Sequence, residues 1–307
     1  MKAIELAREY YEKFGRSMIE EKFPQYSQRI AVGLCGHGSE CFGFDDEVSR
    51  DHDYEPGFCI WLTDEDYREF GFRLSREYSR LPKEFGGIKL VQRSLGASKR
   101  NGVNTVSEYY RTYTGRNGEP ESLYDWLYTP MYYFAEATNG EVFFDGPGEF
   151  TRIRNVIKYG MPEDVRLKKI AANAFMMAQT GQYNFERCLK HGEKGASRIA
   201  LCEFVKHSVE TIFLINKKYP PYYKWMFRAM RELNKGEEIS GILESMMTAD
   251  NATAVKLIEE VSSYVVGELK KCGLTELEGD YLEPHAYAVN DLIKDVNLRN
   301  MHISEGA

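Results

Sequence analysis

The chain has 307 residues, of which 43% are hydrophobic and 28% charged, and its formal net charge is −7 at pH 7. These proportions are typical of a soluble globular protein with one large domain or two ordinary ones, and no apolar run approaches the roughly 20 residues that span a bilayer. The net acidity argues against binding to long nucleic acid, which normally needs a broad basic surface.

Short apolar and β-branched runs alternate with helical periodicity in the N-terminal half. Thr63 is a suitable N-cap, with acids in the first turn after it, as the helix dipole favours. In chain order we predict a helix at 3–21, a strand at 29–34, a short helix at 40–42, a strand at 58–62, a helix at 64–80, strands at 88–92 and 103–106, a helix at 122–137 and a strand at 141–144.

Little strand signal follows Pro162, and the remaining segments have helical periodicity. They run at 163–180, 196–218, 222–233, 250–272 and 281–297. We therefore predict an α+β domain over residues 1–160 and an all-helical bundle over residues 161–307. His207 lies on an otherwise apolar stretch and is expected to be a hydrogen-bonded core histidine.

A Gly-Ser pair and two aspartates stand out in the first half. Asp51 and Asp53 follow Gly38-Ser39 after eleven intervening residues. On an extended backbone, carboxylates at i and i+2 point to the same side, where they suit Mg²⁺. A Gly-Ser turn offers backbone N–H groups and a hydroxyl to phosphates. The pattern predicts a nucleotidyl-transfer site, although Asp-x-Asp alone is also typical of a capped turn.

This spacing resembles the signature of the polymerase-beta-like nucleotidyltransferase superfamily, which is Gly-Ser, a gap of about a dozen residues and Asp-x-Asp. A closer likeness, over roughly residues 30–232, is to a bacterial family known only as domain of unknown function 4037. That likeness runs through 38–53, 140–145 and 219–225. It implies a nucleotidyltransferase-type mixed sheet with flanking helices. It also implies two Mg²⁺ ions held by Asp51 and Asp53 beside the triphosphate.

Other residues are candidates for contacts with the nucleotide. Gly38 and Ser39 would bind its phosphates, and Ser49 stands where related enzymes place a serine. Arg50 is a candidate phosphate ligand or a counter-ion for the neighbouring acids. His52 should point away from the metals. Lys224 is a candidate contact for the triphosphate or an acceptor, with aromatic neighbours that could stack on a base or simply pack a helix corner.

The third carboxylate of many superfamily members has no obvious counterpart. The predicted strands at 88–92 and 103–106 contain no acid. Glu108, just after the second strand, and Asp145, at the end of the last, are the candidates for a third metal ligand. Asp145 more closely resembles a late aspartate of antibiotic nucleotidyltransferases, where that segment is structural or borders the cleft.

The sequence thus favours a Mg²⁺-dependent enzyme that transfers a nucleoside monophosphate from a nucleoside triphosphate, with ATP expected first, to a hydroxyl. The acceptor is a small molecule, a protein or an RNA end, and the helical domain is expected to bind it. The alternative is an inactive nucleotide-binding or partner-binding module, such as a regulator or antitoxin-like protein. With no Cys-x-x-Cys pair and no signal peptide, we expect a cytoplasmic protein with free thiols and no membrane partner.

Overall fold

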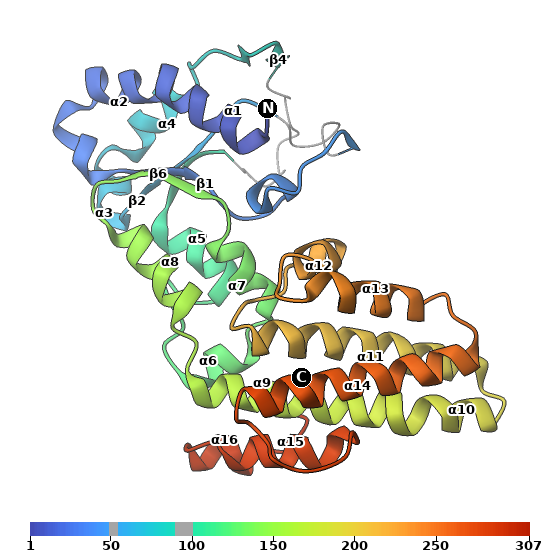
Figure 1. Ribbon diagram of the computed structural model, residues 1–307. Coiled ribbons are helices and arrows are strands. Elements are labelled where there is room, and N and C mark those ends of the chain that lie inside the picture. The colour runs from blue at the N-terminus through green and yellow to red at the C-terminus, as the bar shows by residue number, and fades with distance from the viewer. Residues whose placement is uncertain (49–54, 90–100) are drawn as a thin grey trace. The chain divides into compact units, whose positions relative to one another are not determined.

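The computed structural model describes residues 1–48, 55–89 and 101–307. They form two compact units, one of residues 1–121 with 133–160 and the other of residues 122–132 with 161–307. The chain is coloured from blue at its N-terminus to red at its C-terminus in Figure 1. The predicted α+β class is confirmed, with a small mixed sheet and a helical C-terminal region. The segment 122–132, which we expected in the first domain, lies in the second unit.

The first unit is built on a mixed four-stranded sheet. Its strands are β1 (Ala31–Leu34), β2 (Cys59–Leu62), β5 (Gly102–Thr105) and β6 (Glu141–Asp145). They lie in the order β5-β2-β1-β6. β1 is antiparallel to both β2 and β6, whereas β2 is parallel to β5. The hairpin of β3 (Glu84–Phe85) and β4 (Ile88–Lys89) is separate, and the rest of the strand predicted at 88–92 lies outside the described residues.

Helices cover both faces of this sheet (Figure 1). One face is covered by α1 (Ala3–Tyr10), α2 (Arg16–Lys22) and α4 (Phe72–Tyr78), and the other by α5 (Val106–Thr114), α7 (Met131–Thr138) and α8 (Glu149–Tyr159). A large hydrophobic cluster lies on the first face, where Val32, Ile60 and Val103 pack together. On the second face Trp61 stacks on Phe150, with ring centroids 4.0 Å apart. Even-numbered and odd-numbered residues of β1 and β2 therefore face different helices.

Several predicted helices contain a wider turn. The helix predicted at 3–21 is formed by α1, a π turn at Tyr11–Gly15 and α2. The helix predicted at 64–80 is formed in the same way by α3 (Asp64–Asp66), a π turn at Tyr67–Gly71 and α4. Thr63 caps α3, as predicted, because its hydroxyl accepts a hydrogen bond from the Asp66 N–H at 3.1 Å.

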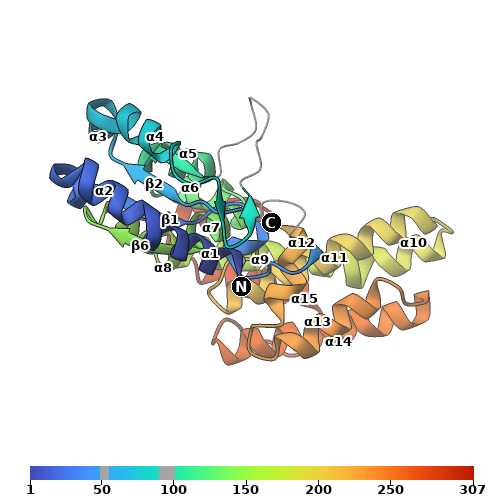
Figure 2. The same cartoon turned by 90° about the horizontal axis from the view of Figure 1, so that it is seen from above.

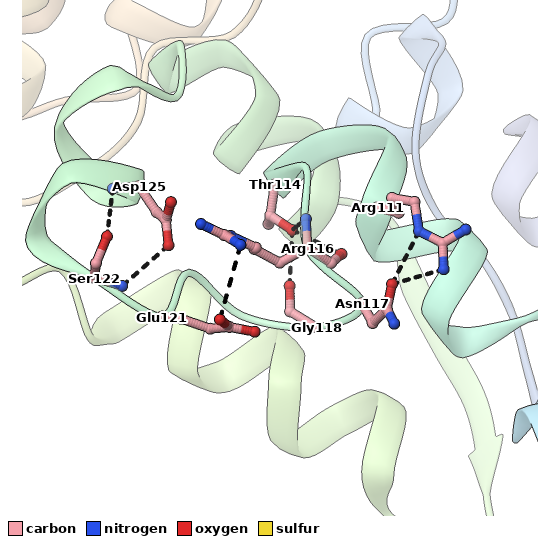
Figure 3. Close-up of polar contacts among 8 residues, drawn as sticks. All are labelled: Arg111, Thr114, Arg116, Asn117, Gly118, Glu121, Ser122 and Asp125. Carbon is pink, nitrogen blue, oxygen red and sulfur yellow. Dashed lines mark hydrogen bonds and ion pairs between the residues drawn. The ribbon is translucent and has the colours of Figure 1, made fainter.

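The single helix predicted at 122–137 is wrong. α6 (Leu123–Tyr128) ends before Thr129, which is extended, and α7 begins after Pro130. Proline lacks an N–H and disfavours helical geometry in the residue before it. α6 starts with a capping box in which Ser122 and Asp125 bond each other's backbone N–H groups (Figure 3).

The loop that follows α5 is held by its own polar contacts (Figure 3). The Arg111 guanidinium donates two hydrogen bonds to Asn117 Oδ1, at 2.9 and 2.6 Å. The Thr114 hydroxyl donates to the Gly118 carbonyl at 2.8 Å. Such contacts fix a loop without burying it.

The second unit is helical. In chain order it contains α6, α9 (Glu163–Met177), a π segment (Ala178–Phe185), α10 (Glu186–Lys190), α11 (Lys194–Ile215), α12 (Tyr223–Met230), α13 (Gly236–Met246), α14 (Asn251–Lys271), α15 (Leu282–Asp291) and α16 (Val296–Asn300). The long helices α9, α11 and α14 lie alongside one another (Figures 1 and 2). The helix predicted at 281–297 is two helices, α15 and α16. None of the helices described is both long enough and apolar enough to cross a membrane.

Candidate functional site

The Gly38-Ser39 turn directly follows the end of β1. Gly38 has a φ of +119°, which a residue with a side chain rarely adopts. Ser39 begins a short 3-10 helix, Ser39–Phe42, and is partly exposed. Among the described residues nothing hydrogen-bonds its hydroxyl. The turn therefore offers a free hydroxyl and a close approach to the backbone.

A second loop fixes the position of this turn. Asn139 Oδ1 accepts a hydrogen bond from the Gly36 N–H at 2.8 Å, and Asn139 Nδ2 donates to the Gly36 carbonyl at 2.7 Å. The next residue, Gly140, donates its N–H to the Cys41 carbonyl at 2.7 Å. Both ends of the turn are thus tied to the residues that lead into β6. We call Asn139 and its two bonds to Gly36 the Asn139 clamp.

The sheet topology brings the start of β2 to the end of β1. Gly33 of β1 is opposite Cys59 of β2, and the strands are antiparallel. The chain therefore enters β2 at the same end of the sheet at which β1 leads into the Gly38-Ser39 turn. Ser49, Arg50, Asp51, His52 and Asp53 lie outside the described residues. Nothing in the structure tests their predicted roles.

A small pocket of about 260 Å³ lies in this unit, next to the turn. His37, Asn104 and Glu108 contribute its polar lining. Asn104 is opposite Trp61 in the parallel β2–β5 pair. The Glu108 side chain is exposed, and its carboxylate has no hydrogen bond or ion pair within the described part of the chain. Glu108 is therefore available as an oxygen ligand, whereas β5 itself carries an amide, not an acid.

Asp145 has a different environment. It is paired with Ala31, at the start of β1, whereas the Gly38-Ser39 turn follows its end. Its Oδ1 accepts a hydrogen bond from the Gly148 N–H at 3.0 Å, and its Oδ2 accepts one from the Thr151 N–H at 2.8 Å. These bonds connect the end of β6 to the first turn of α8, which is a structural role. We do not include Asp145 in the proposed site.

The sequence analysis missed a histidine and a glutamate. His37 Nδ1 lies 2.6 Å from Glu136 Oε2, with side chains that are 52% and 9% exposed. The imidazole also lies beside the Tyr113 ring, at 5.3 Å between centroids. The buried carboxylate orients an exposed imidazole one residue before the Gly-Ser turn. A histidine between two glycines was the only signal in the sequence.

Cys35, one of the thiols that line this pocket, is not suited to be a catalytic nucleophile. Burial raises the pKa of Cys35 to about 12, an effect that Arg154 partly opposes, so this thiol stays protonated at neutral pH. Within the described ranges, no cluster of three His, Cys, Asp or Glu side chains could hold a metal ion.

A larger cavity, of about 770 Å³, lies within the second unit. Its lining includes Lys169, Lys206 and Glu210, with Tyr222 at the start of α12. Lys224 is exposed and does not line the cavity; its ammonium lies 5.1 Å from the centre of the Trp225 ring. The sequence analysis gave no role to Lys169, which lies in the run Lys168-Lys169-Ile170-Ala171-Ala172.

His207 is a hydrogen-bonded core residue, as predicted. It is 3% exposed, and its Nδ1 lies 2.7 Å from Asn173 Oδ1. It belongs to the packing of α11 on α9.

Residues 126–226 match the model of a family described as Domain of unknown function (DUF4037). This match supports the resemblance to that family. No curated protein and no solved structure is significantly similar to the chain. The matched segment begins after the Gly38–Asp53 motif. It contains sixteen of the residues that line the larger cavity, and the remaining four are Ser304 to Ala307.

Proposed function

We propose that this protein is a Mg²⁺-dependent nucleotidyltransferase on a polymerase-beta-like fold. It would transfer a nucleoside monophosphate from a nucleoside triphosphate, with ATP as the first candidate, to a hydroxyl of an acceptor and release pyrophosphate. The direction of two strands carries this proposal. β1 ends at the Gly38-Ser39 turn, and antiparallel β2 starts beside that end, a few residues after Asp51 and Asp53.

Each part of the motif has a chemical role in this proposal. The Gly38 backbone and the Ser39 hydroxyl would bind the phosphates, helped by Ser49 and Arg50. Asp51 and Asp53 would hold the metal ions. When bound, Mg²⁺ supplies the positive charge that lowers the pKa of the attacking hydroxyl and stabilises the departing pyrophosphate.

The described neighbours of the turn suit a hard cation. Glu108, whose carboxylate has no partner among the described residues, and Asn104, which has a side-chain amide, line the same pocket, and Mg²⁺ prefers oxygen ligands. Glu108 is therefore our candidate for the third carboxylate. His37, oriented by Glu136, is placed to donate a hydrogen bond to a phosphate or to the acceptor.

One observation favours a second candidate function, an inactive nucleotide-binding or partner-binding module. β5 carries Asn104 opposite Trp61 and has no acid. If Glu108 does not act as the third carboxylate, the acceptor hydroxyl is poorly activated. Such a protein would bind the triphosphate without turning it over.

The test is thermal unfolding with each nucleoside triphosphate, with and without Mg²⁺, combined with an assay for released pyrophosphate. A triphosphate at about 100 times its Kd should add ~2.7 kcal/mol to the free energy of unfolding. This gain should require Mg²⁺ and disappear in Asp51→Asn and Asp53→Asn. It should persist in Glu9→Gln, which neutralises an exposed acid of α1.

A folded wild-type sample that no triphosphate stabilises would overturn the proposal. Mg²⁺-dependent stabilisation without pyrophosphate release, across a panel of hydroxyl acceptors, would favour the binding module instead. Glu108→Gln separates these cases further, because the enzyme should lose turnover while keeping the stabilisation by the triphosphate.

A further inference from the structure

The cavity of the second unit has the size and walls of a small-molecule site. Its volume of about 770 Å³ lies within the range typical of ligand pockets. Four tyrosines and two methionines contribute aromatic and polarisable surface to its lining: Tyr128, Tyr132, Tyr222, Tyr223, Met131 and Met226. Such walls suit a flat or apolar molecular body.

Lys169 brings a buried ammonium to this cavity. Its side chain belongs to α9 and is 4% exposed. Among the described residues, its Nζ donates one hydrogen bond, to the Leu127 carbonyl at 2.5 Å, although an ammonium carries three donors. Burial lowers the pKa of Lys169 to about 8, and Glu210 partly opposes this effect. A buried cation with unused donors is costly unless an anion accompanies it.

A second cation lines the same cavity. Lys206 is an exposed residue of α11, the helix that packs against α9. No carboxylate of the described residues lies within ion-pair distance of its ammonium. Glu210, one turn further along α11, also lines the cavity, and its own burial raises its pKa. Burial thus disfavours the charged form of Glu210, the carboxylate that interacts with both amines, while a second carboxylate, Glu305, also lines the cavity.

The starts of two helices add positive potential. Met131 and Tyr132 begin α7, Tyr223 begins α12, and all three line the cavity. Prolines precede both starts, and α12 has no side-chain cap. The first turn of a helix carries partial positive charge and attracts anions. Alone these helix starts would define no site, but they reinforce the two lysines.

We infer that this cavity binds a small organic acid, with a planar apolar body between the tyrosines and one anionic group, a carboxylate or a phosphate, at Lys169 and Lys206. The inference does not depend on the nucleotidyl transfer proposed above. A molecule of this class would also be a candidate acceptor if that proposal holds and the molecule carries a hydroxyl.

The test uses a pair of fluorescent probes that differ in one charged group. Anilinonaphthalene sulfonate has an aromatic body and an anion, and phenylnaphthylamine has a similar body without the anion. We expect the full-length protein to bind the sulfonate more tightly. Lys206→Met and Lys169→Met should each weaken its binding by about tenfold, the factor expected when a charged hydrogen bond of ~1.5 kcal/mol is lost. Binding of the neutral probe should stay unchanged.

Controls separate this effect from nonspecific binding of the probes and from misfolding of the variants. Lys256→Met removes an exposed lysine of α14 that does not line the cavity, and should bind both probes like wild type. Lys206 is exposed, so its variant should fold even if loss of Lys169 destabilises the core. Asp53→Asn should also bind both probes normally, because the transfer site is not involved.

Glu210→Gln tests the sign of the charge that the cavity binds, because loss of this carboxylate should strengthen binding of an anion and weaken binding of a cation. Removing this carboxylate should tighten binding of the sulfonate. Naphthoate and naphthyl phosphate should displace the sulfonate, whereas neutral naphthamide should displace it poorly. The stronger of the two acids identifies the anionic group.

Three results would overturn the inference. The first is equal affinity of the protein for the two probes. The second is unchanged affinity for the sulfonate both in Lys206→Met and in a folded Lys169→Met. The third is weaker binding of the sulfonate by Glu210→Gln.

Discussion

The buried side chain of His207 makes the stability of the helical unit depend on pH. Its imidazole lies between α11 and α9 with Nδ1 beside Asn173 Oδ1, and burial, together with the neighbouring Lys206, lowers its pKa to about 4. In the unfolded chain the pKa returns to about 6.5. Between these values the unfolded chain takes up a proton that the folded protein excludes. Stability is therefore complete above about pH 6.5 and is lost as the pH falls toward about 4.

We predict that this one residue costs about 2 to 3 kcal/mol of stability between about pH 7 and pH 4.5. Urea unfolding at both pH values measures it. His207→Gln should lose less stability than wild type over the same interval, although it starts from a lower value. His191→Gln replaces an exposed histidine and should follow wild type. An equal loss in wild type and His207→Gln would show that other groups cause the acid sensitivity.

Lys169 should make ligand binding weaker as the pH rises, whereas His207 makes the protein less stable as the pH falls. Its pKa of about 8 means that the ammonium loses its proton just above neutral pH. The anionic probe binds the protonated form, so its affinity should fall as the pH rises through about 8, by about tenfold if binding raises this pKa by about one unit. Lys206, Glu210 and Glu305 also line the cavity.

Lys169→Arg provides the control for that titration, since a guanidinium keeps its charge throughout this pH range. Fluorescence titrations between about pH 7 and pH 9 should show a flat profile for the variant. A profile that falls equally in both proteins would assign the titration to another group. Glu210, whose pKa is raised by burial, is expected to act at lower pH.

At the scale of elements, the turn after β1 depends on the Asn139 clamp. The two hydrogen bonds to Gly36 hold the backbone that leads into Gly38 and Ser39. We predict that Asn139→Ala costs about 1 to 3 kcal/mol, because it leaves a backbone donor and acceptor without partners. If the turn binds phosphates, the variant should also bind Mg²⁺-triphosphate more weakly. Thermal unfolding with and without nucleotide measures both effects.

Asn117→Ala is the matched control for the clamp. Asn117, in the loop after α5, also accepts hydrogen bonds through its amide oxygen, from Arg111 of α5, but it is exposed (Figure 3). Its loss should change stability by less than about 0.5 kcal/mol and leave nucleotide binding unchanged. Equal effects of the two substitutions would contradict a special role for the clamp.

The elements themselves were largely predictable from the sequence. β1, β2 and β6 are short, mainly apolar runs between turn signals, whereas β5, Gly102–Thr105, is marked by its β-branched Val103 and Thr105. The π turns inside α1–α2 and α3–α4 do not interrupt the apolar pattern, so each predicted helix is one continuous helical segment in the structure. The prediction of one helix at 122–137 is wrong because Pro130 breaks the helix, although the aromatic-rich run continues on both sides of it. The helices α5, α8, α10 and α13 were missed.

The candidate site was only partly predictable, for a physical reason. Gly38 and Ser39 are a local signal, because the positive φ of the turn favours glycine at Gly38 and the adjacent Ser39 supplies a hydroxyl. The His37–Glu136 pair joins a turn after β1 to a helix far along the chain, and no spacing rule foretells such a contact. The larger cavity is likewise assembled from α6, α9, α11 and α12, so its buried Lys169 reads in sequence as part of an ordinary helix.

At the scale of the whole molecule, the chain passes between its two compact units more than once. Residues 122–132 leave the first unit and belong to the second, and residues 133–160 return to the first. The Leu127 carbonyl accepts the hydrogen bond of Lys169, which joins α6 to α9. A domain boundary at residue 160, where the predicted strands end, does not reproduce this exchange, because the sequence of α6 does not indicate that it packs against α9.

The division of the chain predicts which amides each ligand protects from hydrogen exchange in the full-length protein. Anilinonaphthalene sulfonate should slow exchange at 126–132 and 220–226, which line the cavity, by up to about 100-fold at 100 times its Kd. Mg²⁺-ATP should slow exchange at 36–42. Lys206→Met should remove only the first effect and Asp53→Asn only the second. Protection of 126–132 by Mg²⁺-ATP and not by the sulfonate would instead make this segment part of the nucleotide site, in line with the predicted domain of residues 1–160.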